Sequence, residues 1–300
     1  MGAVSHKPII SLKTSIIFLM KRFLYIFFLF LFVLSASAQT YEQWVERGIK
    51  AAEADSLTEA VTYFKKALKA NPKDYRNALV FTNMGKVQET MYWQNTQAKQ
   101  HASDAIESYT MALGFAPEAV PMLEARGKLY LRLENYGKAL MDFTTILDVD
   151  PHHKEARNYR AFCYSQRHEY LEARTDYLRV LEEDATNYSA QLGLALLCQN
   201  TNKMTEALER ITLMVEGHPD KAELYSVRAG MYAENKQSEL AIMDLDKAVE
   251  LEPENQNYYL ARAYLHKEQG NKRKALADFE AAIKNGVPRA SLEEELKSLK

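Results

Sequence analysis

The chain has 300 residues, of which 47% are hydrophobic and 26% charged, and this is ample material for a buried core. Its 38 basic and 40 acidic residues nearly balance, so it lacks the concentrated basic character that general nucleic-acid binding needs. It has only two cysteines, and it shows no glycine-rich phosphate loop or metal-ligand motif, which argues against a disulfide framework and a catalytic centre.

The first 38 residues have the layout of a secretory signal peptide. Basic residues ending with Lys21 and Arg22 precede an uninterrupted apolar run at 23–34, and an Ala-x-Ala motif ends at Ala38. Such a run is typical of a cleaved export signal and is short for spanning a bilayer. We expect cleavage after Ala38 and export, to a bacterial periplasm, with membrane contact only through the signal. An uncleaved anchor is the alternative, and either Met1 or Met20 is the start.

Beyond residue 40 the sequence repeats with a period of 34 residues. Each repeat has a fixed alanine, a large apolar residue four positions later and a small residue twelve positions earlier. The alanines are Ala139, Ala173, Ala207, Ala241 and Ala275. A period near 34 predicts helix–turn–helix units, each of which buries its apolar face against the next. The small residues allow the two helices of a unit to approach closely.

This pattern resembles the tetratricopeptide repeat family, whose motif runs W-x2-L-G-x2-Y, then A-x3-F-x2-A, then P. The first repeat matches best, although Arg47 and Ala51 replace the Leu and Tyr of the motif. Its matching residues are Trp44, Gly48, Ala60, Phe64, Ala67 and Pro72. The resemblance implies an all-α fold, a right-handed α-solenoid of about seven helix-turn-helix repeats.

We assign the solenoid to residues 39–287 and a capping helix to residues 288–300. The seven repeats are expected near residues 41–74, 78–119, 120–153, 154–187, 188–221, 222–255 and 256–287. The stretch Ser291-Leu292-Glu293-Glu294 matches a capping box with Ser291 as the N-cap residue. Leu292, Leu296 and Leu299 fall on one face of the predicted helix, which would cover the open end of the solenoid.

The second repeat carries an insertion, because Ala105 follows Gly85 eight residues later than the period predicts. The extra residues lie within 90–103 and include neither Pro nor Gly, so they form either longer helices or a bulging loop. The alternative is a projection that contacts a ligand through Tyr92 and Trp93, since Tyr and Trp are favoured at interface hot spots.

Four repeats share an arginine at the Leu position of the motif and an aspartate sixteen residues later. The pairs are Arg126 with Asp142, Arg160 with Asp176, Arg228 with Asp244 and Arg262 with Asp278. We interpret them as ion pairs between the two helices of a repeat, which fix the helix registry. A row of ligand-binding arginines is the alternative.

In the tetratricopeptide repeat family, the first helix of each repeat lines a concave groove. Carrying its groove positions over by register gives Lys86, Lys128, Phe162, Leu192, Leu196, Leu260 and Tyr264. Some members bind the C-terminal carboxylate of chaperones with a Lys and an Asn in the first repeat, but Val45 and Ile49 stand there. The resemblance therefore implies a groove for an extended or helical peptide with apolar anchors. The alternative is that these side chains pack against the next helix.

The sequence thus predicts a non-catalytic scaffold or assembly factor of the cell envelope that binds a protein or peptide. We expect no metal, no cofactor and no nucleic-acid partner. Two alternatives stay open: an accessory module that presents substrate to, or senses for, an envelope enzyme or secretion system, and a self-assembling repeat protein that forms homo-oligomers.

Overall fold

The computed structural model describes residues 40–299, and these residues form helices joined by short turns, without a strand. The predicted signal peptide, residues 1–38, and the question of the start residue lie outside the described residues. The chain divides into an N-terminal part that ends at Val149 and a C-terminal part that begins at Asp150. The two parts are described separately.

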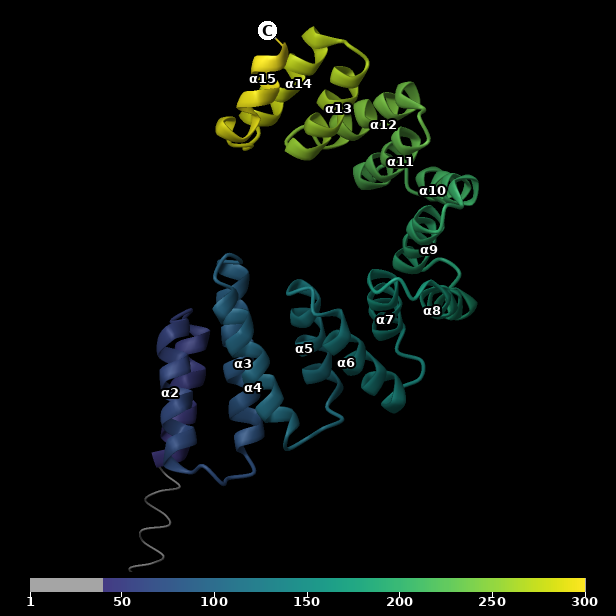
Figure 1. Cartoon of the computed structure of the whole chain (residues 1–300). Helices are drawn as coiled ribbons and strands as arrows, with labels where there is room; N and C mark the ends of the chain where they lie inside the picture. The colour runs from purple at the N-terminus through teal and green to yellow at the C-terminus, as the bar shows by residue number, and fades with distance from the viewer. Residues whose placement is uncertain (1–39, 300) are drawn as a thin grey trace, which may run out of the picture. The chain divides into compact units, whose positions relative to one another are not determined.

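The N-terminal part consists of helix pairs that follow one another along the chain (Figure 1). A helix over residues 40–53 pairs with the next helix, and two further pairs follow. Their bounds are α2 (Leu57–Ala70), α3 (Asn77–Gln94), α4 (Lys99–Leu113), α5 (Val120–Arg132) and α6 (Tyr136–Val149). From α2 onward, each helix packs against the next one.

The C-terminal part continues the same arrangement with four helix pairs and a short terminal helix. The pairs are α7 (Lys154–Gln166) with α8 (Tyr170–Glu183), α9 (Tyr188–Asn200) with α10 (Met204–Gly217), α11 (Ala222–Glu234) with α12 (Ser238–Leu251) and α13 (Gln256–Glu268) with α14 (Lys272–Lys284). A 3-10 turn, η1 (Arg289–Leu292), leads into α15 (Glu293–Leu299). Each helix again packs against its successor in the chain, so the predicted stacking of two-helix units is confirmed.

The close approach of paired helices depends on the small residues of the repeat. A Cβ atom placed on Gly127 of α5 would lie 2.9 Å from the ring of Phe143 in α6, and one on Gly85 of α3 would lie 2.9 Å from the ring of Tyr109 in α4. Such distances are shorter than carbon atoms tolerate, so a larger side chain would push the helices apart. The repeated alanines of the second helices, such as Ala139, are fully buried for the same reason.

In six of the seven described repeats the turn between paired helices places one residue in the left-handed region, and in five of these the residue is not glycine. In the third repeat, Glu134 has a φ of 57°, and the amide of Asn135 donates to the carbonyl of Tyr130 at 2.8 Å. This bond ties the turn back to the helix end. The last repeat places Gly270 there, with a φ of 76°. The non-glycine residues pay a steric cost at this position.

The insertion in the second repeat is mostly helical. α3 continues nine residues beyond Gly85, whereas α5 continues five beyond Gly127, and α4 begins six residues before Ala105, whereas α6 begins three before Ala139. A connection over residues 95–98 takes up the remainder. Both helices of this pair are therefore lengthened, and no large loop projects from the repeat.

The four predicted Arg–Asp pairs are confirmed. In each, the Nε and Nη2 atoms of the arginine donate to the two carboxylate oxygens at 2.6–3.0 Å. Nη1 of Arg126 also donates to Thr110 Oγ1 at 2.9 Å, and Nη1 of Arg262 to Asp246 Oδ1 at 2.5 Å. Both partners lie in the second helix of the preceding repeat. Arg126 and Arg262 thus link neighbouring repeats, and all four arginines are engaged internally, which argues against a ligand-binding row.

The terminal helix packs as expected, but the prediction of a capping box at Ser291 is wrong. Leu292, Leu296 and Leu299 are buried against the last repeat in a cluster with Phe279. Ser291, however, lies inside η1, and its hydroxyl donates to the carbonyl of Pro288 at 2.7 Å. The chain therefore enters α15 through a 3-10 turn that begins after Pro288, so Ser291 does not occupy the N-cap position.

Candidate functional site

The candidate site in the C-terminal part is a row of exposed residues on the first helices. Phe162 of α7, Leu196 of α9 and Tyr264 of α13 occupy the same position of their repeats, and Gly230 of α11 holds that position in the repeat between the last two. The three large side chains are 41%, 38% and 46% exposed. We call this row, with the side chains that share its helix faces, the first-helix face. All three are among the predicted groove residues, and their part in binding stays a prediction.

Two other predicted contact residues mainly support this face. Leu192 is partly buried and packs into the cluster formed by α9, α10 and α11, which includes Ile211 and Leu224. Leu260 is partly buried against the last repeat, beside Phe279 and Leu296. These two leucines therefore bury much of their surface against neighbouring helices, as the alternative interpretation of the groove positions predicts.

On α9 and α11, the two middle helices of this face, the exposed charged residues are acidic. Helix α9 contains no charged residue, whereas α11 carries the exposed Glu223 and Glu234 on the side of Gly230. Tyr188 donates from its hydroxyl to Glu223 at 3.5 Å, and Gln199 donates from its amide to Glu234 at 2.5 Å. These donors are neutral, so they leave the negative charge of both carboxylates uncompensated.

The far end of this face is tied to the terminal helix. Lys267 of α13 donates to Glu295 of α15 at 2.9 Å, and the hydroxyl of Tyr264 donates to the other oxygen of the same carboxylate at 3.4 Å. The lysine holds the pKa of Glu295 below its usual value. The ring of Tyr264 also packs edge-to-face on Phe279. These contacts fix the orientation of Tyr264 on the surface.

The N-terminal part holds a second candidate surface, a pocket of about 790 Å³ between the helix over 40–53 and α3. Its lining includes Val45 and Ile49, which stand where some family members have the Lys and Asn that bind a chaperone's C-terminal carboxylate. Tyr75 and Leu79 lie opposite and are 80% and 60% exposed. The sequence analysis missed this pair, although Leu79 occupies the second position of its repeat, a groove position in the family.

The two predicted groove lysines differ in their surroundings. Lys86 of α3 is exposed, whereas Lys128 of α5 is partly buried and donates to Glu124, four residues earlier in the same helix, at 2.5 Å. Because Lys128 is engaged by this carboxylate, the two lysines do not form the free cationic pair that an acidic ligand would require.

The proposed insertion contact is half wrong. Tyr92 is buried, in a cluster with Ala102, Ala105 and Tyr109, so it belongs to the core between α3 and α4. Trp93 is 45% exposed, with the guanidinium of Arg132 lying 5.1 Å from its ring centre. Of the two, only Trp93 can meet a partner.

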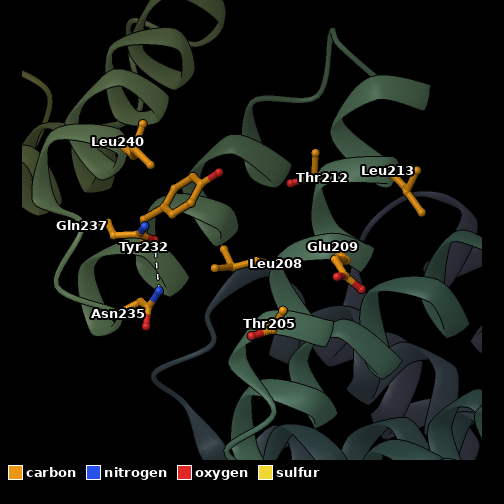
Figure 2. Close-up of a pocket in the computed structure, with 9 residues that line it drawn as sticks. All are labelled: Thr205, Leu208, Glu209, Thr212, Leu213, Tyr232, Asn235, Gln237 and Leu240. Carbon is orange, nitrogen blue, oxygen red and sulfur yellow. Dashed lines mark hydrogen bonds between the residues drawn. The ribbon is translucent and has the colours of Figure 1, made fainter.

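A further pocket, of about 690 Å³, lies beside the second helices of the C-terminal part (Figure 2). Leu208 of α10 and Tyr232 of α11 lie at its centre, and Asn235 donates to Gln237 at its edge at 3.0 Å. The lining contains one titratable acid, Glu209, and no histidine, lysine or cysteine.

Residues 40–299 contain neither a metal-ligand cluster nor a helix suited to spanning a membrane. No three His, Cys, Asp or Glu side chains of this region come together as metal ligands do. None of its helices combines the length and the apolar character that crossing a membrane requires.

Comparisons with family models and with solved structures indicate the same family. Family models described as Tetratricopeptide repeat match residues 124–190 and residues 52–74, 222–255 and 256–285, just over half of the chain. The crystal structure of a tetratricopeptide repeat protein from Parabacteroides merdae is 28% identical, with a TM-score of 0.73 over 87% of this chain and 99% of that one.

Among curated proteins, human DnaJ homolog subfamily C member 7 is 28% identical over 152 residues, 49% of this chain and 31% of the relative. Its homolog from Schizosaccharomyces pombe is 26% identical over 170 residues, 55% of this chain and 36% of the relative. The chain thus spans about a third of the length of these relatives. The repeat pattern, the stacked helix pairs and the family matches agree, and the chain belongs to the tetratricopeptide repeat family.

Proposed function

We propose that this protein is a non-catalytic scaffold of the bacterial cell envelope that captures a segment of a partner protein on its first-helix face. One observation carries the proposal: Phe162, Leu196 and Tyr264 stay exposed at the same position of three repeats. Water contact with large apolar side chains costs free energy, about 25 cal/mol for each Å². A row of them at one repeat position, on successive first helices, is typical of an interaction site.

The location in the envelope rests on residues 1–38, whose basic start, apolar run and Ala-x-Ala motif match an export signal. The preformed helices support capture of a flexible segment, because little ordering of the scaffold is needed on binding. The proposed role is assembly or presentation of a partner, without chemistry on this chain.

The test compares the partners that wild type and variants recover from a cell-envelope extract. Phe162→Glu with Leu196→Glu places two charges on the first-helix face and should abolish recovery of specific partners. Leu171→Glu with Leu213→Glu is the matched control, because these leucines are exposed on second helices. The control should recover the same partners as wild type. Equal recovery by the first-helix double variant contradicts the proposal, provided that circular dichroism shows it folded.

Self-assembly is the second candidate, and exposed aliphatic side chains on the second helices favour it. Leu171, Leu213 and Met243 are each well exposed on α8, α10 and α12. Light scattering across a range of protein concentrations distinguishes the two. A mass that rises with concentration and returns to the monomer in the Leu171→Glu, Leu213→Glu variant supports self-assembly, and a constant monomer mass removes it.

A further inference from the structure

Gly230 differs from the glycines that the helix packing requires. A Cβ atom on Gly48, Gly85, Gly127 or Gly193 would come within 2.3–2.9 Å of a neighbouring aromatic ring, so these positions need glycine. A Cβ atom on Gly230 would meet nothing within 4 Å, and its φ is not in the left-handed region. Glycine inside a helix costs stability relative to alanine. Neither packing nor backbone conformation in this chain accounts for that cost.

Gly230 leaves a gap in the row of exposed apolar side chains on the first-helix face. It lies in α11 at the repeat position that Phe162, Leu196 and Tyr264 fill with large exposed side chains. α11 follows the α9–α10 pair and precedes the α13–α14 pair in the stack. The row of apolar side chains is thus interrupted at one helix, and the interruption is open to solvent. An incoming large side chain finds room there and apolar side chains on the repeats to either side.

The charge around the gap indicates what kind of segment fits. Glu223 and Glu234 lie seven residues before and four residues after Gly230, which places all three on one side of α11. These separations are about 10 Å and 6 Å along the helix axis. Within the described residues neither carboxylate forms an ion pair, and their hydrogen bonds come from the hydroxyl of Tyr188 and the amide of Gln199. A partner with Lys or Arg near its apolar anchor would complement this charge.

We propose that Gly230 is the specificity-determining position of the first-helix face. It admits a large apolar side chain, aromatic or leucine-like, from a partner segment whose flanking Lys or Arg residues pair with Glu223 and Glu234. This inference rests on the proposed function and adds to it the chemistry of the partner: a basic polypeptide segment with an apolar anchor, and not an acidic one.

Fluorescently labelled synthetic peptides test the proposal through changes in anisotropy. The probe is a short peptide with a central Phe and Lys residues on both sides, compared with the same peptide carrying a central Ala and with one carrying Glu in place of Lys. The wild-type protein should bind the Phe–Lys peptide about tenfold more tightly than either comparison peptide, since burying a Phe side chain is worth at least a factor of ten.

The decisive variant is Gly230→Leu, which fills the gap and should weaken binding of the Phe–Lys peptide about tenfold or more. Gly217→Leu is the matched control, because Gly217 also has open space around it and lies at the end of α10. It should bind as wild type does. Gly230→Ala should raise the melting temperature and still weaken binding, so that a folding defect cannot explain the loss.

The acidic pair is tested separately with Glu223→Gln combined with Glu234→Gln. This variant should lose the preference for Lys-flanked over Glu-flanked peptides and bind with a weaker dependence on salt, because the charge attraction is screened by ions. An unchanged preference would overturn the charge part of the proposal.

The outcomes separate this inference from the proposed function. If Gly230→Leu and Gly217→Leu bind the peptide equally, Gly230 is not the specificity position, while capture on the first-helix face stands as long as Phe162→Glu with Leu196→Glu abolishes binding. If that double variant binds as wild type does, or if wild type binds none of the peptides while envelope capture fails too, both the face and the inference are overturned.

Discussion

Arg228 and Asp244 face each other across the two helices of the sixth repeat and form two parallel hydrogen bonds. Nε and Nη2 of the arginine each donate to one carboxylate oxygen at 2.8 Å. The carboxylate raises the pKa of Arg228 above its usual value. The third nitrogen of the guanidinium, Nη1, donates to Thr212 Oγ1 of the preceding repeat at 3.4 Å. One arginine therefore joins three helices, and both charged groups are largely removed from water.

Removing one partner of this pair should be costly. Arg228→Ala leaves the Asp244 carboxylate buried without its cation, and we expect a loss of about 3–5 kcal/mol in the free energy of unfolding. The double variant Arg228→Met, Asp244→Leu should lose far less, because neither charge stays behind. Urea denaturation followed by circular dichroism measures both. Lys50→Ala, which breaks the exposed pair with Glu46, is the control and should change little. Equal effects of Arg228→Ala and Lys50→Ala would contradict the prediction.

Two glycines in the C-terminal part should respond to alanine in opposite directions. Gly193→Ala places a methyl group 2.3 Å from the buried ring of Tyr177, and we expect a destabilisation of about 1–3 kcal/mol from overpacking. Gly230→Ala meets open space and should stabilise the protein by about 0.5–1 kcal/mol, because alanine loses less backbone entropy on folding. Thermal melts of the two variants beside wild type check the signs. A destabilised Gly230→Ala would show that the backbone there needs glycine.

The left-handed turn residues offer a route to higher stability. Lys236 has a φ of 57° between α11 and α12, and Gly270 occupies the same position one repeat later. Lys236→Gly removes the steric cost and should stabilise the protein by about 1 kcal/mol. Lys247→Gly, in the middle of α12, is the matched control and should destabilise it, since glycine weakens a helix interior. Both shifts are read from urea midpoints, and a loss of stability in Lys236→Gly would refute the strain argument.

His266 should make the last repeat sensitive to acid. Burial lowers its pKa below the usual 6.5, Lys274 and Arg262 act in the same direction, and Asp278 and Asp246 oppose them. Its Nδ1 atom is buried without a hydrogen-bond partner. The unfolded chain then binds a proton at a higher pH than the folded chain does. Stability from this group is therefore present above pH 6.5 and is lost as pH falls through 6.5 toward the folded pKa.

The replacement His266→Tyr tests this, because tyrosine fills the same position of three other repeats, at Tyr130, Tyr164 and Tyr232. Between neutral and mildly acid pH, the free energy of unfolding should fall less steeply in the variant than in wild type. The difference in slope is at most that of one proton, about 1.4 kcal/mol per pH unit. Urea midpoints measured across that range give the slope. Identical slopes in wild type and variant would show that His266 does not titrate on unfolding.

Much of the fold follows from the spacing of residues along the chain. The first helices of the last five repeats begin at Val120, Lys154, Tyr188, Ala222 and Gln256, each 34 residues after the one before. The period is visible in the sequence because each repeat packs against its nearest neighbours through the same positions. The Arg–Asp pairs were predictable for the same reason: sixteen residues span one helix end, one turn and the start of the next helix.

The errors in the candidate site have physical causes. The alternative that placed Tyr92 in a ligand contact fails because α3 continues beyond its usual end, so that Tyr92 lies seven residues from Gly85 on the same buried side of the helix. Ser291 matched a capping box, yet the chain after Pro288 tightens into a 3-10 turn that uses its hydroxyl internally. Tyr75 and Leu79 were missed because their exposure depends on what the helix over 40–53 leaves uncovered.

Residue spacing is enough to predict the helix pairs, their order of stacking and the internal ion pairs, since these arise between residues at fixed separations within a repeat or between adjacent repeats. The folded structure is needed to tell which apolar side chains stay exposed. It separated the exposed Phe162, Leu196 and Tyr264 from the partly covered Leu192 and Leu260, and it distinguished the open space at Gly230 from the crowded space at Gly193. The reason is that exposure depends on the atoms that neighbouring helices bring close, and a motif position does not specify those atoms.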